Sequence, residues 1–161
     1  MAKILTQIEA HNIGNIRLYA GDAAELLAWA PPRSLARIDL IHPDPWPKRR
    51  HWKRRFVQDA TVNAMARILK DGGEFRFVSD IDDYCAWTLA HLMRSSDFLW
   101  TAERAADWRQ PWDGYTMTRY GRRSRTRGTC RGVSAVSAGG LSSHSGACAA
   151  RAGFHRAASA G

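Results

Sequence analysis

The chain has 161 residues, 45% of them hydrophobic, which suits one ordinary domain with an apolar core. No apolar run approaches the length of a membrane span, the first residues do not resemble a signal peptide, and the three cysteines and six histidines have no metal-ligand spacing. We therefore expect a reduced, cytoplasmic protein without a membrane segment or a metal site.

The positive charge is distributed unevenly. The formal net charge is +9, but residues 121–161 contain seven arginines and no Asp, Glu or Lys. Residues 1–120 hold 17 of the 24 basic residues and all 15 acidic ones, a net charge of +2. Their basic side chains concentrate in Lys48–Arg55, where six of eight residues are Lys or Arg. This local patch indicates a nucleic-acid-binding face, with a solvated charge run as the simpler alternative.

Two helical patterns surround a short strand pattern at the start of the chain. We expect a helix over 1–12, a strand over 16–19 and a helix over 23–30, which Pro31 ends. Each helix has an apolar face. These faces comprise Ile4, Leu5 and Ile8 in the first helix, and Leu26, Leu27 and Trp29 in the second.

The middle of the chain continues this alternation. A strand over 37–41 runs into the loop Pro43–Pro47, and a helix is expected from about 53 to 70, ended by a turn at Asp71–Gly73. A strand over 74–78 and a helix over 81–95 follow. The order predicts an α/β fold with a parallel sheet and helices on both faces.

Three acidic residues follow the predicted strands: Asp22, Asp44 and Asp80. Ligands of such sheets bind beyond the carboxyl ends of the strands, so we expect the three carboxylates to share a site. Each could instead cap the helix that follows it, and for Asp80 this alternative has at least equal weight.

Asp44 lies between two prolines, which stiffen the backbone, and it directly precedes the basic patch. The motif Pro43–Lys48, followed by Arg50-His51 and Lys53–Arg55, resembles the bacterial tRNA (guanine-N7)-methyltransferases, a class I family that uses S-adenosylmethionine. Shorter motifs occur in the same order as in that family: Gly21–Ala23, Gly72-Gly73, Ser79-Asp80 with Tyr84, and Thr118–Tyr120. The resemblance covers about residues 1–120 and implies a Rossmann-like fold with a mostly parallel sheet.

The resemblance implies methyl transfer from S-adenosylmethionine to N7 of guanosine 46 in the tRNA variable loop. It makes Asp44 the catalytic carboxylate beside the methyl donor and places Asp22 at the adenine or a nearby part of the cofactor. The implied substrate-binding residues are Lys48, Asp80, Thr118, Arg119 and Tyr120. The implied RNA-contacting residues are Arg50, His51, Trp52, Lys53, Arg54 and Arg55. For Trp52, base stacking and packing on the helix both stay open.

Parts of the family pattern have no counterpart in this sequence. The glycine-rich loop after the first strand and the acid after the second strand are missing, and Gly121 stands where the family has Glu. We expect a partial domain over 1–120, incomplete at its N-terminus, with exposed apolar edges that aggregate or seek a partner. Ala, Gly and Ser make up 24 of the 41 residues over 121–161, which predicts a disordered tail. We interpret this tail as an out-of-frame translation, with an Arg-rich RNA-binding arm as the alternative.

Three other hypotheses remain. The chain could be a non-catalytic RNA-binding module that uses Lys48–Arg55, or a gene product that does not fold stably. An adenine amino-methyltransferase is disfavoured, because its acid-Pro-Pro-aromatic loop differs from Pro43–Trp46. The sequence does not divide the tasks of Asp44 and Asp80, and it leaves the oligomeric state open.

Overall fold

A four-stranded sheet forms the centre of the protein, seen in a computed structural model that describes residues 2–104, 107, 112, 114–116, 118, 121, 122 and 131–137. Its strands are β1 (Leu35–Ile41), β2 (Leu69–Ser79), β3 (Phe98–Trp100) and β4 (Arg131–Ser137), in the order β1-β2-β4-β3. β1 is parallel to β2, whereas β4 is antiparallel to both β2 and β3. Three strands therefore share one direction, which confirms the predicted α/β class with a mostly parallel sheet.

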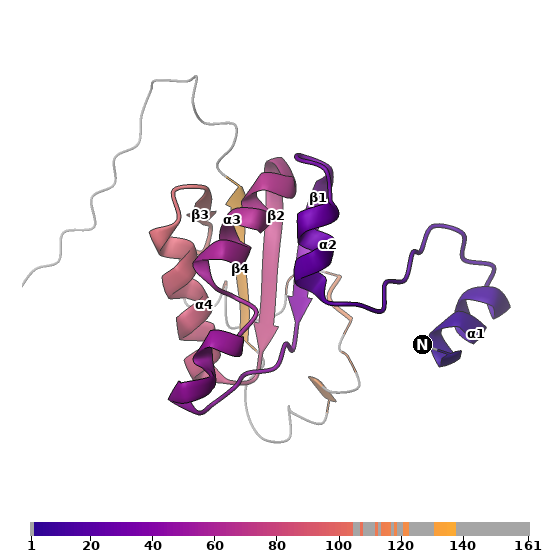
Figure 1. Cartoon of the computed structure of the whole chain (residues 1–161), viewed down its shortest axis with the longest axis horizontal. Helices are drawn as coiled ribbons and strands as arrows, with labels where there is room; N and C mark the ends of the chain where they lie inside the picture. Colours follow the sequence, from indigo (N-terminus) through magenta and orange to yellow (C-terminus); the bar gives the residue numbers. More distant parts are fainter. Residues whose placement is uncertain are drawn as a thin grey trace, which may run out of the picture.

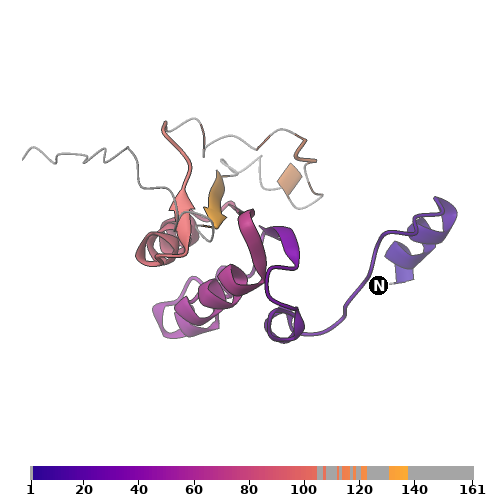
Figure 2. The same ribbon diagram turned by 90° about the horizontal axis from the view of Figure 1, so that it is seen from above.

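Three helices cover one face of this sheet (Figures 1 and 2). They are α2 (Ala23–Trp29), α3 (Asp59–Ile68) and α4 (Asp82–Arg94). The prediction of helices on both faces is not met in the described part of the chain. The reason is topological. Helix α3 connects β1 to β2 and α4 connects β2 to β3, and both connections run in the same direction across the sheet. Right-handed crossovers that run in one direction place their helices on the same face.

The hydrophobic core lies between this face and the helices. β2 supplies Phe75 and Phe77, both fully buried, and Tyr84 of α4 packs edge-on against Phe77 with ring centroids 5.1 Å apart. The buried residues of α3 recur at a helical spacing of three: Val62, Met65 and Ile68. The middle of the chain therefore folds around β2, the strand with the largest buried share.

Side chains close the ends of the helices. The backbone N–H of Ala24 donates to Asp22 Oδ1 at 2.8 Å, which makes Asp22 the N-cap of α2. At the other end of α2, the Arg67 guanidinium donates to the carbonyl oxygens of Leu27 and Ala30 at 2.7 and 3.0 Å. These bonds satisfy helix-end groups that have no partner within the helix and attach α2 to α3.

The N-terminal segment departs from the sequence prediction. Helix α1 (Ala2–Ala10) forms as expected but lies away from the sheet in both views (Figures 1 and 2). Residues 16–19, predicted to be a strand, form none, because no described strand lies beside them to pair with. In α2, Leu27 is buried, but Trp29 remains 78% exposed.

The helix predicted from residue 53 begins later. A 3₁₀ helix, η1 (Arg49–Arg54), comes first, and α3 starts at Asp59. The intervening Val57 is buried, and its carbonyl oxygen accepts from Trp87 Nε1 at 2.7 Å. Because Trp87 of α4 donates to this carbonyl oxygen, the Val57 backbone makes a tertiary hydrogen bond and is not part of the helix.

The turn predicted at Asp71–Gly73 is an irregularity within β2. The β1–β2 register shifts there, from Leu35↔Leu69 to Arg37↔Glu74. Gly72 has a φ of +72°, and a Cβ on Gly73 would lie 2.8 Å from the Lys70 carbonyl oxygen. Both glycines are therefore required by the backbone of this bulge.

The described part of the tail includes a strand. Residues 131–137 of the segment predicted to be disordered form β4, which pairs with β2 from Glu74↔Val136 to Ser79↔Arg131. Ala135 and Ser137 are buried, two residues apart as a strand requires. The prediction of disorder is therefore wrong for these seven residues. Apart from them and residues 121 and 122, the tail lies outside the described residues.

No helix within the described ranges is long and apolar enough to cross a membrane. Cys85 is buried, with its Sγ 3.7 Å from the Ser79 carbonyl oxygen, and Cys130 and Cys148 lie outside the described residues.

Candidate active site

The structure brings together the segments that follow β1 and β2. The two strands pair in parallel up to Ile41↔Val78, and the backbone N–H of His42 donates to the Val78 carbonyl oxygen at 2.8 Å. The loop Pro43–Pro47 and the residue Asp80 therefore leave the sheet from the same edge. This is the carboxyl edge, where open α/β sheets bind their ligands.

The loop after β1 has a strained backbone. His42 and Trp46 have positive φ angles of 49° and 42°, which non-glycine residues rarely adopt. Each such residue costs on the order of 1–3 kcal/mol, and strain of this kind concentrates at functional sites. Asp44 lies between the two strained positions, and its side chain is exposed. The local geometry thus presents one carboxylate to solvent on a stiff loop.

His42 and Asp80 connect the two segments. The His42 side chain is only 7% exposed, and its Nδ1 lies 3.9 Å from Asp80 Oδ1. Burial lowers the pKa of His42, and the charge of Asp80 opposes that shift. Helix α4 has Ile81 at its N-cap, and the Ile81 N–H donates to Ser79 Oγ at 3.2 Å. Asp80 is therefore not the cap of α4, and its carboxylate lies at the candidate site.

No described strand places Asp22 at the sheet edge where His42 and Asp80 lie. The segment before it forms no strand in the structure, so Asp22 does not mark a strand end. Its Oδ1 accepts the Ala24 N–H, which is the N-cap alternative considered from the sequence. The segments that hold Asp44 and Asp80 thus leave one edge of the sheet, whereas no described strand joins Asp22 to that edge.

A basic face continues from the loop onto η1. Its exposed cationic residues are Lys48, Arg49, Arg50, Lys53 and Arg54. The Arg54 guanidinium lies 4.9 Å from the centre of the Trp46 ring, and His51 contacts the same ring edge-on at 5.7 Å. The sequence contains no Asp or Glu from Pro45 to Gln58, so no acidic residue within this segment offsets the charge. The face can therefore attract a polyanion.

Two residues of the predicted RNA-contacting stretch turn inward. The Arg55 side chain is 0% exposed, so it does not belong to the exposed basic face with which it was predicted to contact RNA. Trp52 is half-buried, with its ring centroid 5.3 Å from that of Trp87. Packing on α4, the second alternative for Trp52, is the arrangement observed. Both residues turn inward because η1 places its C-terminal end against α4.

Little of the predicted Thr118–Tyr120 motif can be described. Thr118 Oγ1 accepts from the Gly121 N–H at 3.0 Å, and Arg119 and Tyr120 lie outside the described residues. Conversely, the sequence prediction omitted His42, which the structure places at the site. The signal for His42 was a polar residue at the end of an apolar strand directly before a proline.

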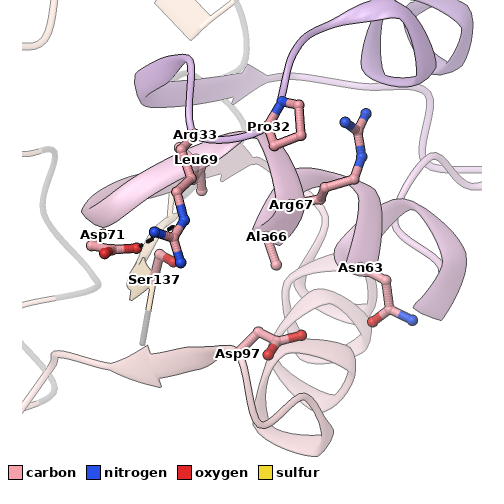
Figure 3. Close-up of a pocket in the computed structure, with 9 residues that line it drawn as sticks. All are labelled: Pro32, Arg33, Asn63, Ala66, Arg67, Leu69, Asp71, Asp97 and Ser137. Carbon is pink, nitrogen blue, oxygen red and sulfur yellow. Dashed lines mark ion pairs between the residues drawn. The ribbon is translucent and has the colours of Figure 1, made fainter. Parts of the chain in front are cut away.

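A pocket of about 360 Å³ lies at the opposite edge of the sheet (Figure 3). It lies where β1 and β2 begin, and its lining includes Arg33, Arg67 and Asp71. Arg33 forms an ion pair with Asp71 at 3.6 Å, and Arg67 binds the carbonyls of α2. Its cationic side chains are thus engaged in structural contacts. Within the described ranges, no group of three or more His, Cys, Asp or Glu is arranged to hold a metal ion.

The family comparison identifies this α/β domain as a methyltransferase domain. Residues 1–130 match the family model described as "Putative methyltransferase", and the chain belongs to that family.

Two relatives make the similarity more specific. The chain is 80% identical over 128 residues to a tRNA (guanine-N(7)-)-methyltransferase of Bradyrhizobium diazoefficiens, covering 80% of this chain and 54% of the relative. It is 78% identical over 128 residues to the protein of the same name in Rhodopseudomonas palustris strain BisB18, covering 80% and 51%. The chain thus spans about half the length of the curated relatives it matches.

A solved SAM-dependent O-methyltransferase from Thermotoga maritima is a more distant neighbour. It covers 81% of this chain and 43% of its own, with 14% identity and a TM-score of 0.43, too low to add to the family assignment.

Proposed function

We propose that this chain carries the substrate loop and the RNA face of a tRNA (guanine-N7)-methyltransferase. The observation that carries the proposal is the exposed Asp44 on a strained proline loop. This loop leaves the same sheet edge as Asp80 and continues into the basic face of η1. The names of the two relatives, which are 78% and 80% identical to this chain over 128 aligned residues, support the same reaction.

The proposed reaction needs alignment more than it needs a base. Guanine N7 has an in-plane lone pair and no proton, so methyl transfer requires N7 to point at the methyl carbon, and such positioning can contribute several kcal/mol. A carboxylate can accept hydrogen bonds from guanine N1–H and the 2-amino group, which fixes the purine. It also stabilises the positive charge that the ring gains. Asp44 and Asp80 both suit these tasks.

S-adenosylmethionine, when bound, would supply an electrophilic methyl group on a sulfonium. The negative charge of Asp44 fits this donor, because an exposed carboxylate on a rigid loop attracts a neighbouring cation such as the sulfonium. We assign Asp44 to the methyl-donor side and Asp22 to the adenine side.

The tRNA would bind across the basic face. We assign phosphate contacts to Lys48, Arg50, Lys53 and Arg54, with His51 beside them. Each phosphate that these cations neutralise releases counterions, so binding should weaken steeply with salt. Thr118, Arg119 and Tyr120 are proposed to hold the target nucleotide.

Asp44→Asn tests the catalytic assignment, because it keeps the shape of the side chain and removes its charge. In this chain, and in a full-length relative with the matching substitution, we expect methyl transfer to tRNA to fall by about 100-fold or more. The affinity for tRNA should stay unchanged. Asp97→Asn, at the opposite edge of the sheet, is the control. Retained activity of Asp44→Asn, or a methyl group on an atom other than N7, would contradict the proposal.

A non-catalytic RNA-binding module is the second candidate. The observation in its favour is that the basic face is complete on η1, whereas Oδ1 of Asp22, the proposed adenine-side residue, accepts the Ala24 N–H as the N-cap of α2. Calorimetric titration of S-adenosylmethionine into the folded chain separates the two. Binding supports the enzyme, and salt-sensitive tRNA binding without cofactor binding supports the module.

A further inference from the structure

Arg55 differs from its cationic neighbours on η1, which are exposed. Its guanidinium is enclosed by three aromatic rings, with centres 4.8 Å away for Trp52, 5.0 Å for Tyr84 and 5.1 Å for Trp87. Tyr84 and Trp87 belong to α4, so the side chain of Arg55 crosses from the basic run to that helix. Cation–π attraction to the three rings replaces part of the hydration that the buried guanidinium loses.

Two polar contacts fix the direction of this guanidinium. Arg55 Nε donates to the Pro45 carbonyl oxygen at 2.9 Å, and Nη2 forms an ion pair with the Asp83 carboxylate. Pro45 directly follows Asp44, and Asp83 lies in the first turn of α4, three residues after Asp80. One side chain therefore bridges the two segments that form the candidate site.

The energetics favour a geometric role for this bridge. A buried guanidinium is costly to desolvate, and its Nη1 makes no hydrogen bond within the described part of the chain. The ion pair is only partly buried, because the Asp83 side chain is 58% exposed, and such pairs add little net stability. Fixed geometry is therefore the benefit that the pair supplies here.

We propose that Arg55 is a positioning residue that holds the Asp44 loop against the start of α4, and that it does not contact RNA. The inference rests on the proposed function only where it takes Asp44 to be catalytic. Lysine could not replace Arg55, because its single nitrogen lacks the planar fork that reaches a carbonyl and a carboxylate in different directions.

Amide hydrogen exchange of the loop tests the bridge without any activity assay. The loop and Lys48, the residue after it, have three exchangeable amides, those of Asp44, Trp46 and Lys48, since the other loop positions are proline. In Arg55→Lys and Arg55→Met we expect these amides to exchange about tenfold faster or more, because a hydrogen bond to a charged group is lost. Exchange at Phe77, in the central strand, reports global unfolding and is the internal reference.

Asp83→Asn removes the carboxylate at the other end of the bridge. This variant tests the bridge if the Arg55 variants fold poorly. It should accelerate the same three amides, and combining it with Arg55→Lys should add little, since both remove one bridge. Loop exchange that matches the wild type in both single variants, relative to Phe77, would overturn the proposal.

Binding of labelled tRNA separates positioning from RNA contact. Arg54→Met, the exposed neighbour, should reduce the slope of log affinity against log salt by about one, whereas Arg55→Met should leave it unchanged. A loss of slope in Arg55→Met equal to that of Arg54→Met would make Arg55 a phosphate contact and overturn the inference. If the wild-type chain does not bind tRNA, the proposed function fails, and the exchange rates still decide the role of Arg55.

Discussion

At the scale of single residues, the candidate site depends on side chains in unusual backbone or solvent environments. His42 is buried with a positive φ and lies beside Asp80, and Asp44 is exposed between two prolines. These two environments give the neighbouring residues different tasks. His42 joins the ends of two strands, while Asp44 is free to approach a substrate.

Acid should destabilise the folded protein through His42, because its largely buried side chain disfavours the charged imidazolium. Its pKa is lowered by burial, so the unfolded chain takes up the proton first as the pH falls below about 6.5. The free energy of unfolding should therefore decrease between pH 7.5 and 5.5. His42→Asn removes the titrating group, and asparagine tolerates a positive φ.

Urea denaturation of both proteins at the two pH values measures this effect. The pH dependence should be smaller in His42→Asn than in the wild type. An equal dependence in the two proteins would assign it to other groups.

At the scale of elements, a charged cluster attaches the start of α3 to the end of α4. Asp59 Oδ1 lies 2.6 Å from His91 Nδ1 and accepts from Arg94 Nη2 at 3.1 Å. The hydrogen bond to His91, and then that to Arg94, lower the pKa of Asp59. The two helices that cover the core are thus held at one end by polar contacts and along their length by Val62, Met65 and Leu92.

Asp59→Asn should destabilise the protein at neutral pH and have no effect in strong acid. A carboxyl group with a lowered pKa contributes stability above its unfolded pKa, and this contribution is lost as the pH falls through the folded value. Thermal or urea unfolding at pH 7 and pH 3 would show the difference, with Asp97→Asn as the control. A variant whose deficit persists unchanged at pH 3 would argue for a packing effect instead.

Packing of the central strand should dominate the stability of the sheet. Phe77 is fully buried and contacts Tyr84 of α4. Phe77→Ala should lower the free energy of unfolding by about 3–5 kcal/mol, because it leaves a cavity in the core. Chemical denaturation measures this loss, and Leu99→Ala, on the exposed side of β3, should cost far less.

At the scale of the whole molecule, the sheet has an open edge. Within the described residues, β1 pairs only with β2, and Leu35 and Ile41 are 38% and 37% exposed. Trp29 of α2 adds a large exposed ring. An unpaired edge next to apolar surface favours pairing with a further chain.

This edge should make the isolated chain self-associate as its concentration rises. Lysine at Leu35 and Trp29 should reduce association, because a charge disfavours both edge pairing and burial. Analytical ultracentrifugation over a range of concentrations measures it, with Asn63→Lys, an exposed residue of α3, as the matched control. A wild-type chain that stays monomeric throughout would show that the edge is adequately protected.

The sequence by itself determined the α/β class, the positions of β1, β2 and α4, and the pairing of a proline-locked Asp44 with a basic stretch. These follow from local patterns, since strand alternation, proline and charge act on neighbouring residues. Only the tertiary structure decided that residues 16–19 form no strand, that residues 131–137 form β4, and that Arg55 faces the core. Each of these depends on a partner distant in sequence: a strand to pair with, the free side of β2, or the rings of α4. Local pattern cannot supply such a partner, because it is brought near only when the chain folds.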